Sequence, residues 1–142
     1  MKITDVIRDK GGEVVTIAPD RSVAELLALL ADHKIGAVVV SADGSAVDGI
    51  VSERDVVRRL HADGAGIIDR PVSDIMTAEV RTCDPGDDLG SLEATMTEHR
   101  IRHVPVVRDG QLQAIVSIGD VVKRRISALS AERDQLEAYI SQ

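Results

Sequence analysis

The sequence predicts a mixed α/β fold built from two pseudo-symmetric copies of a β-α-β-β-α unit, followed by a C-terminal helix. Two observations carry this prediction: a repeat spans most of the chain, and the hydrophobic pattern within each copy switches between the strand and helix periods. The 142 residues are enough for one compact domain with a buried core. Hydrophobic residues make up 44% of the chain and charged residues 29%, so its composition is that of an ordinary globular protein.

The repeat emerges when residues 66 positions apart are compared. His33 recurs as His99, and the residues around them match as well. One extra residue in the stretch 45–49 reduces the offset to 65, so that Ile-Val-Ser followed by Asp-Val-Val stands both in 50–57 and in 115–122. Two copies are too few for a solenoid. We therefore expect a pseudo-twofold pair of units packed face to face.

Each copy begins with a short strand and a helix. Val14–Ile17 and Val80–Cys83 are rich in β-forming residues and are followed by a proline that marks a turn. In the first copy, Ser22 with Glu25 three residues later is the pattern of a capping box, which predicts a helix start. In the second copy, Asp88 is the expected helix cap.

A β-hairpin and a second helix complete each copy. The hairpins are Ala37–Ser41 with Gly49–Ser52, and Val104–Val107 with Ala114–Ser117. An Asp-Gly pair between the strands favours a tight turn, although the first loop is longer. The second helix of each copy begins near the serine that ends the hairpin.

These elements divide the chain into four parts. Repeat 1 covers residues 1–64, a Gly- and Pro-containing linker 65–71, repeat 2 residues 72–126, and an amphipathic C-terminal helix residues 127–142. The last part carries a short heptad-like stripe, which packs either on its own domain or on a second subunit or client protein. Its positions are Val122, Ile126, Leu129, Arg133, Leu136 and Ile140.

The most specific local feature is the strand-to-helix junction, Ser52 to Asp55 in the first copy and Ser117 to Asp120 in the second. A serine at a helix N-terminus offers a hydroxyl beside free backbone N–H groups, which suit an anion. The aspartate offers two acceptor oxygens for the paired hydroxyls of a ribose. Arg54 adds a guanidinium that matches phosphate. The alternative is that Ser and Asp only cap the second helix, and their recurrence in both copies weighs against it.

These segments resemble a tandem pair of cystathionine beta-synthase (CBS) domains, a Bateman module, of the stand-alone bacterial type. The resemblance covers about residues 4–125 and rests on GIVSERD at 49–55, RHVPV at 102–106 and IVSIGD at 115–120, with SDIMT at 73–77. It implies two β-α-β-β-α repeats packed sheet to sheet, with two pseudo-symmetric clefts between them. In that family the clefts bind AMP, ADP, ATP, NAD or S-adenosylmethionine.

The resemblance also implies roles for single residues. Asp55 and Asp120 would hold ribose hydroxyls, and Ser52, Ser117 and Arg54 would approach phosphate. The remaining nucleotide-binding candidates would line the adenine slots or the second junction: Thr16, Ile17, Ile35, Gly36, Ala37, Val38, Thr82, Cys83, Ile101, Arg102, His103, Val104, Pro105 and Ile118.

The two copies are not equivalent. Arg54 corresponds to Gly119, so the second junction lacks the guanidinium. Arg102 and His103 correspond to a glycine and an alanine, which adds polar groups to the second slot, and we expect His103 to contact the ligand. The two clefts should therefore differ in affinity, with an empty cleft as the limiting case.

The expected function is regulatory: an adenine nucleotide (AMP, ADP, ATP or NAD) binds as an energy or cofactor signal. Paired carboxylates, a nucleophile elbow, a P-loop and GxGxxG are missing from the sequence, so we expect no enzyme, no catalytic residue, no catalytic cofactor and no metal. The expected partners are a second copy in a homodimer and a client protein. The alternative is a ligand-free scaffold or protein-interaction dimer.

Composition excludes several other classes. The net charge of −7 argues against nucleic acid, which needs a dense basic face. No apolar run approaches the roughly 18 residues of a membrane span, and the N-terminus is unlike a signal peptide. The single cysteine, Cys83, fits a reduced compartment and aligns with Ile17, which predicts a small buried apolar role. We therefore expect a cytoplasmic protein.

Overall fold

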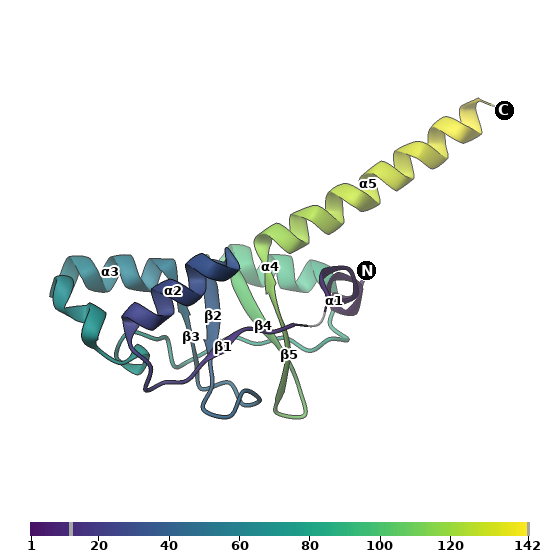
Figure 1. Ribbon diagram of the computed structural model, residues 1–142. Coiled ribbons are helices and arrows are strands. Elements are labelled where there is room, and N and C mark those ends of the chain that lie inside the picture. The colour runs from purple at the N-terminus through teal and green to yellow at the C-terminus, as the bar shows by residue number, and fades with distance from the viewer. Residues whose placement is uncertain (12, 142) are drawn as a thin grey trace.

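The computed structural model describes residues 1–11 and 13–141 of the chain. Over these residues, helices and short strands alternate in a mixed α/β structure with one three-stranded and one two-stranded sheet. The sheets lie next to each other at the centre of the molecule, with both hairpin turns on one side and most of the helices on the other (Figure 1). This arrangement, with its long C-terminal helix, confirms the predicted fold class.

The first repeat contains β1 (Thr16–Ile17), α2 (Val23–His33), β2 (Ala37–Val40), β3 (Gly49–Ser52) and α3 (Glu53–Asp63). β1 pairs in parallel with β2, and β2 pairs antiparallel with β3. The elements follow the predicted order. β1 is shorter than expected because only its two residues pair with β2.

The second repeat contains α4 (Leu89–His99), β4 (His103–Arg108), β5 (Gln111–Ser117) and the start of α5 (Ile118–Ile140). β4 and β5 form an antiparallel hairpin. The strand expected at residues 80–83 is reduced to a single bridge, because Cys83 alone exchanges backbone hydrogen bonds with β4, at 3.0 Å to the carbonyl of Pro105 and 2.8 Å from the amide of Val107.

The helix caps agree with the local sequence. Ser22 accepts a hydrogen bond from the amide of Glu25 at 3.1 Å, and Asp88 accepts one from the amide of Gly90 at 2.9 Å. The Glu25 carboxylate faces Arg21 at 3.7 Å, so only one half of the expected capping box forms. Such caps each stabilise a helix by about 1 kcal/mol.

Each repeat has its own hydrophobic core, and each core is completed by a segment from outside that repeat. Ile67 comes from the 3-10 helix η1 (Ala65–Asp69) in the linker, and Val72 from the 3-10 helix η2 (Val72–Asp74) at the start of the second repeat; both join the first core. Full burial of such a side chain stabilises by about 1.5–3 kcal/mol, so this segment is held against the first repeat. The first core otherwise contains Ile17, Val23, Leu26, Leu30, Val38, Val40, Val51, Val56 and Ile75.

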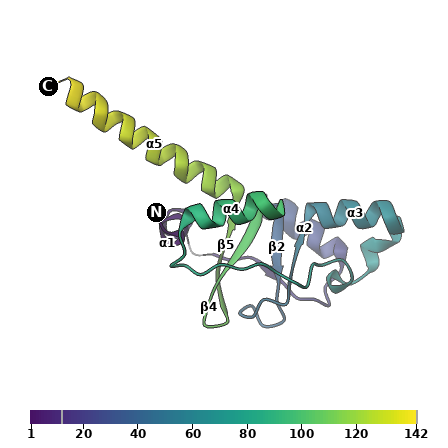
Figure 2. The ribbon, with the colours of Figure 1, turned by 180° about the vertical axis from the view of Figure 1, so that it is seen from behind.

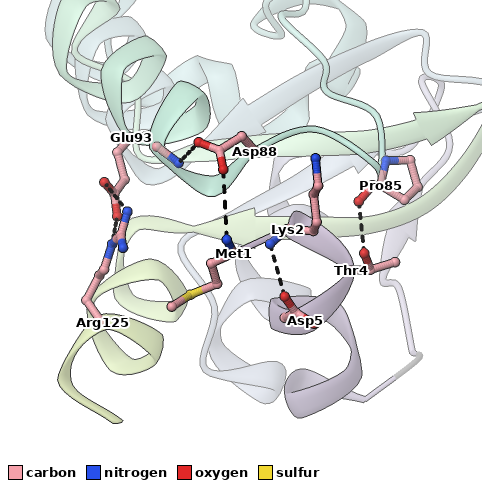
Figure 3. Close-up of polar contacts among 9 residues, drawn as sticks. Met1, Lys2, Thr4, Asp5, Pro85, Asp88, Glu93 and Arg125 are labelled. Atoms are coloured by element: carbon pink, nitrogen blue, oxygen red, sulfur yellow. Dashed lines mark hydrogen bonds and ion pairs between the residues drawn. The ribbon is translucent and has the colours of Figure 1, made fainter. Parts of the chain in front are cut away.

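The second core takes Ile3 and Val6 from α1 (Ile3–Lys10), a helix that the sequence analysis did not predict. Figure 3 shows how α1 is fastened: the Thr4 hydroxyl donates to the carbonyl of Pro85 at 3.2 Å, and the terminal ammonium of Met1 faces Asp88 at 3.9 Å. The N-terminal helix therefore packs against the second repeat. The rest of this core is Leu89, Leu92, Met96, Val104, Val106, Ala114, Val116 and Val121.

The helix α5 leaves the body of the molecule after its first turns and projects into solvent (Figures 1 and 2). Its root is fixed by Val121 in the second core and by an ion pair of Arg125 with Glu93 (Figure 3). Within the described part of the chain, every helix is too short or too polar to cross a bilayer. The large apolar residues exposed along α5 are Ile118, Val122, Ile126, Leu129, Leu136, Tyr139 and Ile140.

Candidate functional site

A cleft of about 940 Å³ lies between the two repeats, at the start of α3. This volume is within the range of small-molecule sites. Its lining from the first repeat is Gly36, Ala37, Ile50, Ser52, Glu53, Arg54, Asp55, Val57 and Arg58. Its lining from the second half of the chain is Thr77, Glu79, Val80, Arg81, His99, Arg100, Ile101, Arg102 and His103.

The cleft brings together candidate residues from both copies. Ser52, Arg54 and Asp55 come from the β3–α3 junction, and Gly36 and Ala37 from the start of β2. Arg102 and His103, which the sequence analysis assigned to the second slot, lie in this cleft with Asp55. Ile101 accompanies them. The cleft around Asp55 therefore depends on both repeats.

The other candidates lie elsewhere. Ile17 and Val38 belong to the first core and Val104 to the second, and Cys83 packs against the second core. Pro105 is buried, Thr16 is half-buried on β1, and Thr82 is exposed. Ile35 lines a separate hollow of about 580 Å³ beside the end of α2. Ser117, Ile118 and Asp120 form the second junction, at the start of α5.

Asp55 both caps α3 and keeps one oxygen available. Its Oδ2 accepts hydrogen bonds from the amide of Ser52 at 2.8 Å and from the Ser52 hydroxyl at 3.1 Å. Its Oδ1 accepts none from the described residues. Because a carboxylate can accept several hydrogen bonds, the capping role leaves acceptor sites for a ligand hydroxyl. The capping and ribose-binding interpretations are therefore compatible at this residue.

The arginines that lack an ion-pair partner among the described residues all line this cleft. Arg54, Arg58, Arg81, Arg100 and Arg102 line it, and none of them forms an ion pair with a described residue. Every other arginine of the chain does form one: Arg8, Arg21, Arg59, Arg70, Arg108, Arg124, Arg125 and Arg133. Glu53, Asp55 and Glu79 also line the cleft, so the five arginines leave it with an excess of positive charge in a chain whose net charge is −7.

A family model described as CBS domain matches residues 3–62 and 72–127. The chain belongs to the CBS domain family. The resemblance read from the sequence is confirmed, and the two matched segments correspond to the two repeats of a CBS domain pair.

Relatives agree with this assignment. A mitochondrial CBS domain-containing protein of Arabidopsis thaliana is 35% identical over 146 residues, which cover 97% of this chain and 71% of that protein. The crystal structure of a CBS-domain containing protein from Agrobacterium tumefaciens is 45% identical with a TM-score of 0.84, over 88% of this chain and 99% of that chain. A CBS domain protein from Pyrobaculum aerophilum, solved in complex with AMP, is 25% identical with a TM-score of 0.75, over 84% and 89%.

The second half-site of the CBS pair differs from the first at its aspartate. Asp120 accepts from the amide of Ser117 at 2.9 Å, as Asp55 does from Ser52, but it also accepts from the ammonium of Lys10 at 2.8 Å. Partial burial opposes ionisation of Asp120, but the hydrogen bonds from Lys10 and Ser117 outweigh it and lower the pKa of this carboxyl. Asp120 is thus ionised and already engaged within the chain.

His103 lies where the two half-sites approach each other. A Cβ at Gly36 would come within 3.5 Å of the His103 ring and 3.6 Å of the Glu53 carboxylate, so these groups lie close together. Burial, and then the charge of Lys10, lower the pKa of His103. The neutral ring is therefore favoured at pH 7, and it can donate one hydrogen bond from one nitrogen and accept one at the other.

We expect this lowered pKa to make the folded CBS pair sensitive to acid. A histidine whose pKa is lower in the folded state binds its proton more readily when unfolded, so stability is fully present above about pH 6.5 and falls as the pH drops below it. In His103→Gln, the melting temperature should fall less between pH 7.5 and pH 5 than in the parent. His61→Gln, at an exposed position of α3, is the matched control. Equal slopes in the parent and His103→Gln would contradict this assignment.

The thiol of Cys83 is unreactive at neutral pH. Burial, with the nearby charges of Asp87 and Asp84, raises the pKa of its thiol to about 12, and its Sγ lies 3.7 Å from the carbonyl of Pro105. The thiolate, which is the nucleophilic form, is negligible at neutral pH. This agrees with the apolar packing role predicted from the sequence.

Several cleft residues were missed by the sequence analysis. Arg58 lies one turn beyond Arg54 on α3, a spacing that places both side chains on one helix face and could have been recognised. Arg100 follows the end of α4 as Lys34 follows the end of α2, so the repeat could have indicated a basic residue at this position. Arg81 gave no local signal, since it corresponds to an apolar residue of the first copy.

Proposed function

We propose that this CBS domain pair is a regulatory module that binds an adenine nucleotide (AMP, ADP, ATP or NAD) in the cleft around Asp55. It acts as an energy or cofactor sensor and not as an enzyme. The observation that carries the proposal is the distribution of arginines: those of the cleft form no ion pair with a described residue, whereas each of the others forms one. Clustered guanidinium groups without carboxylate partners are typical of a site for phosphate.

Each part of a nucleotide has a matching group in this proposal. The phosphates approach the free arginines and the N-terminus of α3, where Ser52 stands. The ribose hydroxyls bind the Asp55 carboxylate. The base lies between aliphatic side chains such as Val80 and Ile101, because the chain has no Phe or Trp for stacking. The AMP complex of the Pyrobaculum relative supports this ligand class.

Regulation follows from the composition of the cleft. The Asp55 cleft takes its lining from both repeats, so a nucleotide that touches both sides favours one relative arrangement of the repeats over another. A ligand can shift such an equilibrium only by its difference in affinity for the two states. We propose that a client protein, met in the cytoplasm, reads this shift.

The proposal is tested by thermal melting of the parent chain with single nucleotides. AMP, ADP, ATP or NAD should raise the melting temperature, and guanosine nucleotides should raise it less. A ligand at 100 times its dissociation constant stabilises by about 2.7 kcal/mol. Added salt should reduce the effect, because the arginines are exposed and salt screens them.

Adenosine is the matched control for the phosphate part of the site. It should stabilise the chain less than AMP or ADP does, because it cannot use the free arginines. A flat response to every adenosine compound at millimolar concentration would favour the second candidate function, a ligand-free scaffold. The exposed apolar stripe of α5 is the observation that favours this second candidate, because it supports self-association without any ligand.

A further inference from the structure

A lysine closes the half-site around Asp120. The ammonium of Lys10 donates to Asp120 Oδ2 at 2.8 Å and to the carbonyl oxygen of Ile115 at 2.6 Å. Both side chains of the ion pair are largely covered, with 33% of Lys10 and 24% of Asp120 exposed. The carboxylate that the repeat would offer to a ribose is therefore bound by the chain's own cation.

The half-site around Asp55 has no such group. At an offset of 69, the buried Ile3 and Val6 of α1 match Val72 and Ile75 of the first core. By this offset Lys10 corresponds to Glu79, which carries no positive charge. The carbonyl of Ile50, which corresponds to that of Ile115, accepts instead from the backbone amide of Thr77 at 2.9 Å. No ammonium or guanidinium of the described residues donates a hydrogen bond to Asp55. The two half-sites thus share the Ser-x-x-Asp junction and differ in the cation beside it.

The position of Lys10 is determined by packing. Lys10 ends α1, whose Ile3 and Val6 are buried in the second core. A further ion pair joins Asp9 of the same helix to Arg124 of α5 at 2.8 Å, and the contacts of Thr4 in Figure 3 fasten the other end. The backbone of Lys10 is therefore held beside Asp120. Forming this ion pair loses less conformational entropy than forming an ordinary surface pair.

We propose that Lys10 is the specificity-determining residue that makes this CBS pair a single-site module, with a nucleotide in the Asp55 cleft and none beside Asp120. The inference rests on the proposed function. Lys10 and Ser117 both donate to Oδ2 of Asp120, and the Lys10 ammonium neutralises the carboxylate whose other oxygen, Oδ1, would receive a ribose hydroxyl. Because a hydrogen bond to a charged group is stronger than one to a neutralised group, we expect Lys10 to lower affinity at the Asp120 half-site by about tenfold.

The test is calorimetric titration of the full chain with ADP, comparing the parent with Lys10→Met, which removes the ammonium and keeps an unbranched side chain of similar size. The parent should bind one ADP per chain and Lys10→Met two. Lys2→Met, which removes the same charge from the opposite end of α1, should still bind one. Lys10→Arg should also bind one, because a guanidinium can keep the pair with Asp120.

The number of ADP molecules bound by each variant supports or overturns the role of Lys10. Two ADP molecules on the parent, or one on Lys10→Met, would overturn the role of Lys10 while leaving the proposed function in place. ADP binding to neither protein would overturn both, so the two failures are distinct. If Lys10→Met does not fold, as melting would reveal, Lys10→Gln replaces it. Gln keeps a polar end, is one bond shorter and lacks the charge, so a second ADP should bind.

Discussion

Asp55→Ala should lower the affinity of the chain for an adenine nucleotide by at least about tenfold and leave the fold intact. The reason lies in the two oxygens of the carboxylate, of which Oδ2 caps α3 and Oδ1 has no donor among the described residues. A hydrogen bond to a charged group contributes about 1.5–3 kcal/mol, and 1.4 kcal/mol corresponds to tenfold in affinity. Titration calorimetry measures the affinity, and thermal melting measures the stability.

A purely structural role for Asp55 predicts a different pair of results. Loss of a helix cap costs about 1 kcal/mol of stability and leaves intrinsic affinity nearly unchanged. Asp120→Ala is the matched control, because it removes the same cap from α5 and should leave binding in the Asp55 cleft at the parent value. If Asp55→Ala binds nucleotide like the parent, the ribose assignment is wrong and the Ser-x-x-Asp pattern is only a cap.

The phosphate side of the cleft is separable from the ribose side. Arg54→Ala should weaken AMP or ADP more than adenosine, since its guanidinium addresses the phosphates only. Arg59, also on α3, makes an ion pair with Asp63 at 3.2 Å and lies outside the cleft lining. Arg59→Ala should therefore leave the ratio of the two affinities unchanged, and an equal change in both variants would refute the phosphate role.

Removal of residues 126–142 should convert a homodimer into a monomer. Residues 126–140 form the part of α5 that projects into solvent in Figure 1, and Ile126, Leu129, Leu136 and Ile140 are exposed there at 57–80%. An isolated helix of this length is marginal in water, so the apolar stripe requires a partner surface. The alternating steps of four and three fit a second helix of the same kind, and closed twofold dimers are the commonest assembly.

Charge along α5 indicates how two copies would pair. Basic residues such as Lys123 stand near its start, and Glu132 and Glu137 stand toward its end. An antiparallel arrangement would bring unlike charges together. Light scattering should give the parent about twice 15.2 kDa and the truncated chain the mass of one copy. A monomeric parent across working concentrations, or a dimeric truncated chain, would contradict this prediction.

A point variant distinguishes the stripe from the helix as a whole. Leu129→Asp places a charge in the stripe and should dissociate the dimer. Gln135→Asp places the same charge on the outer face of α5 and should not. Since neither residue belongs to the described lining of the Asp55 cleft, both variants should bind nucleotide like the parent.

The sequence by itself determined the order of the elements within the two repeats and the residues that cap their helices, because these depend on short-range patterns. Ser52 and Ser117 open α3 and α5, and Asp88 opens α4, through hydrogen bonds to amides two or three residues away. The repeat then extended each local prediction to the second copy. The strand at residues 80–83 was the exception, because a strand forms only where a neighbour pairs with it, and β4 pairs with Cys83 alone.

The tertiary structure decided which segments meet. Nothing in a local pattern announces that α1 packs in the second core, or that Lys10 finds Asp120 at a separation of 110 residues. The cleft likewise combines Arg54 and Asp55 with Arg100 and Arg102 from the other copy, so their joint charge appears only after folding. Such long-range neighbours follow from how the hydrophobic faces of the two repeats are covered, which no periodicity within one segment encodes.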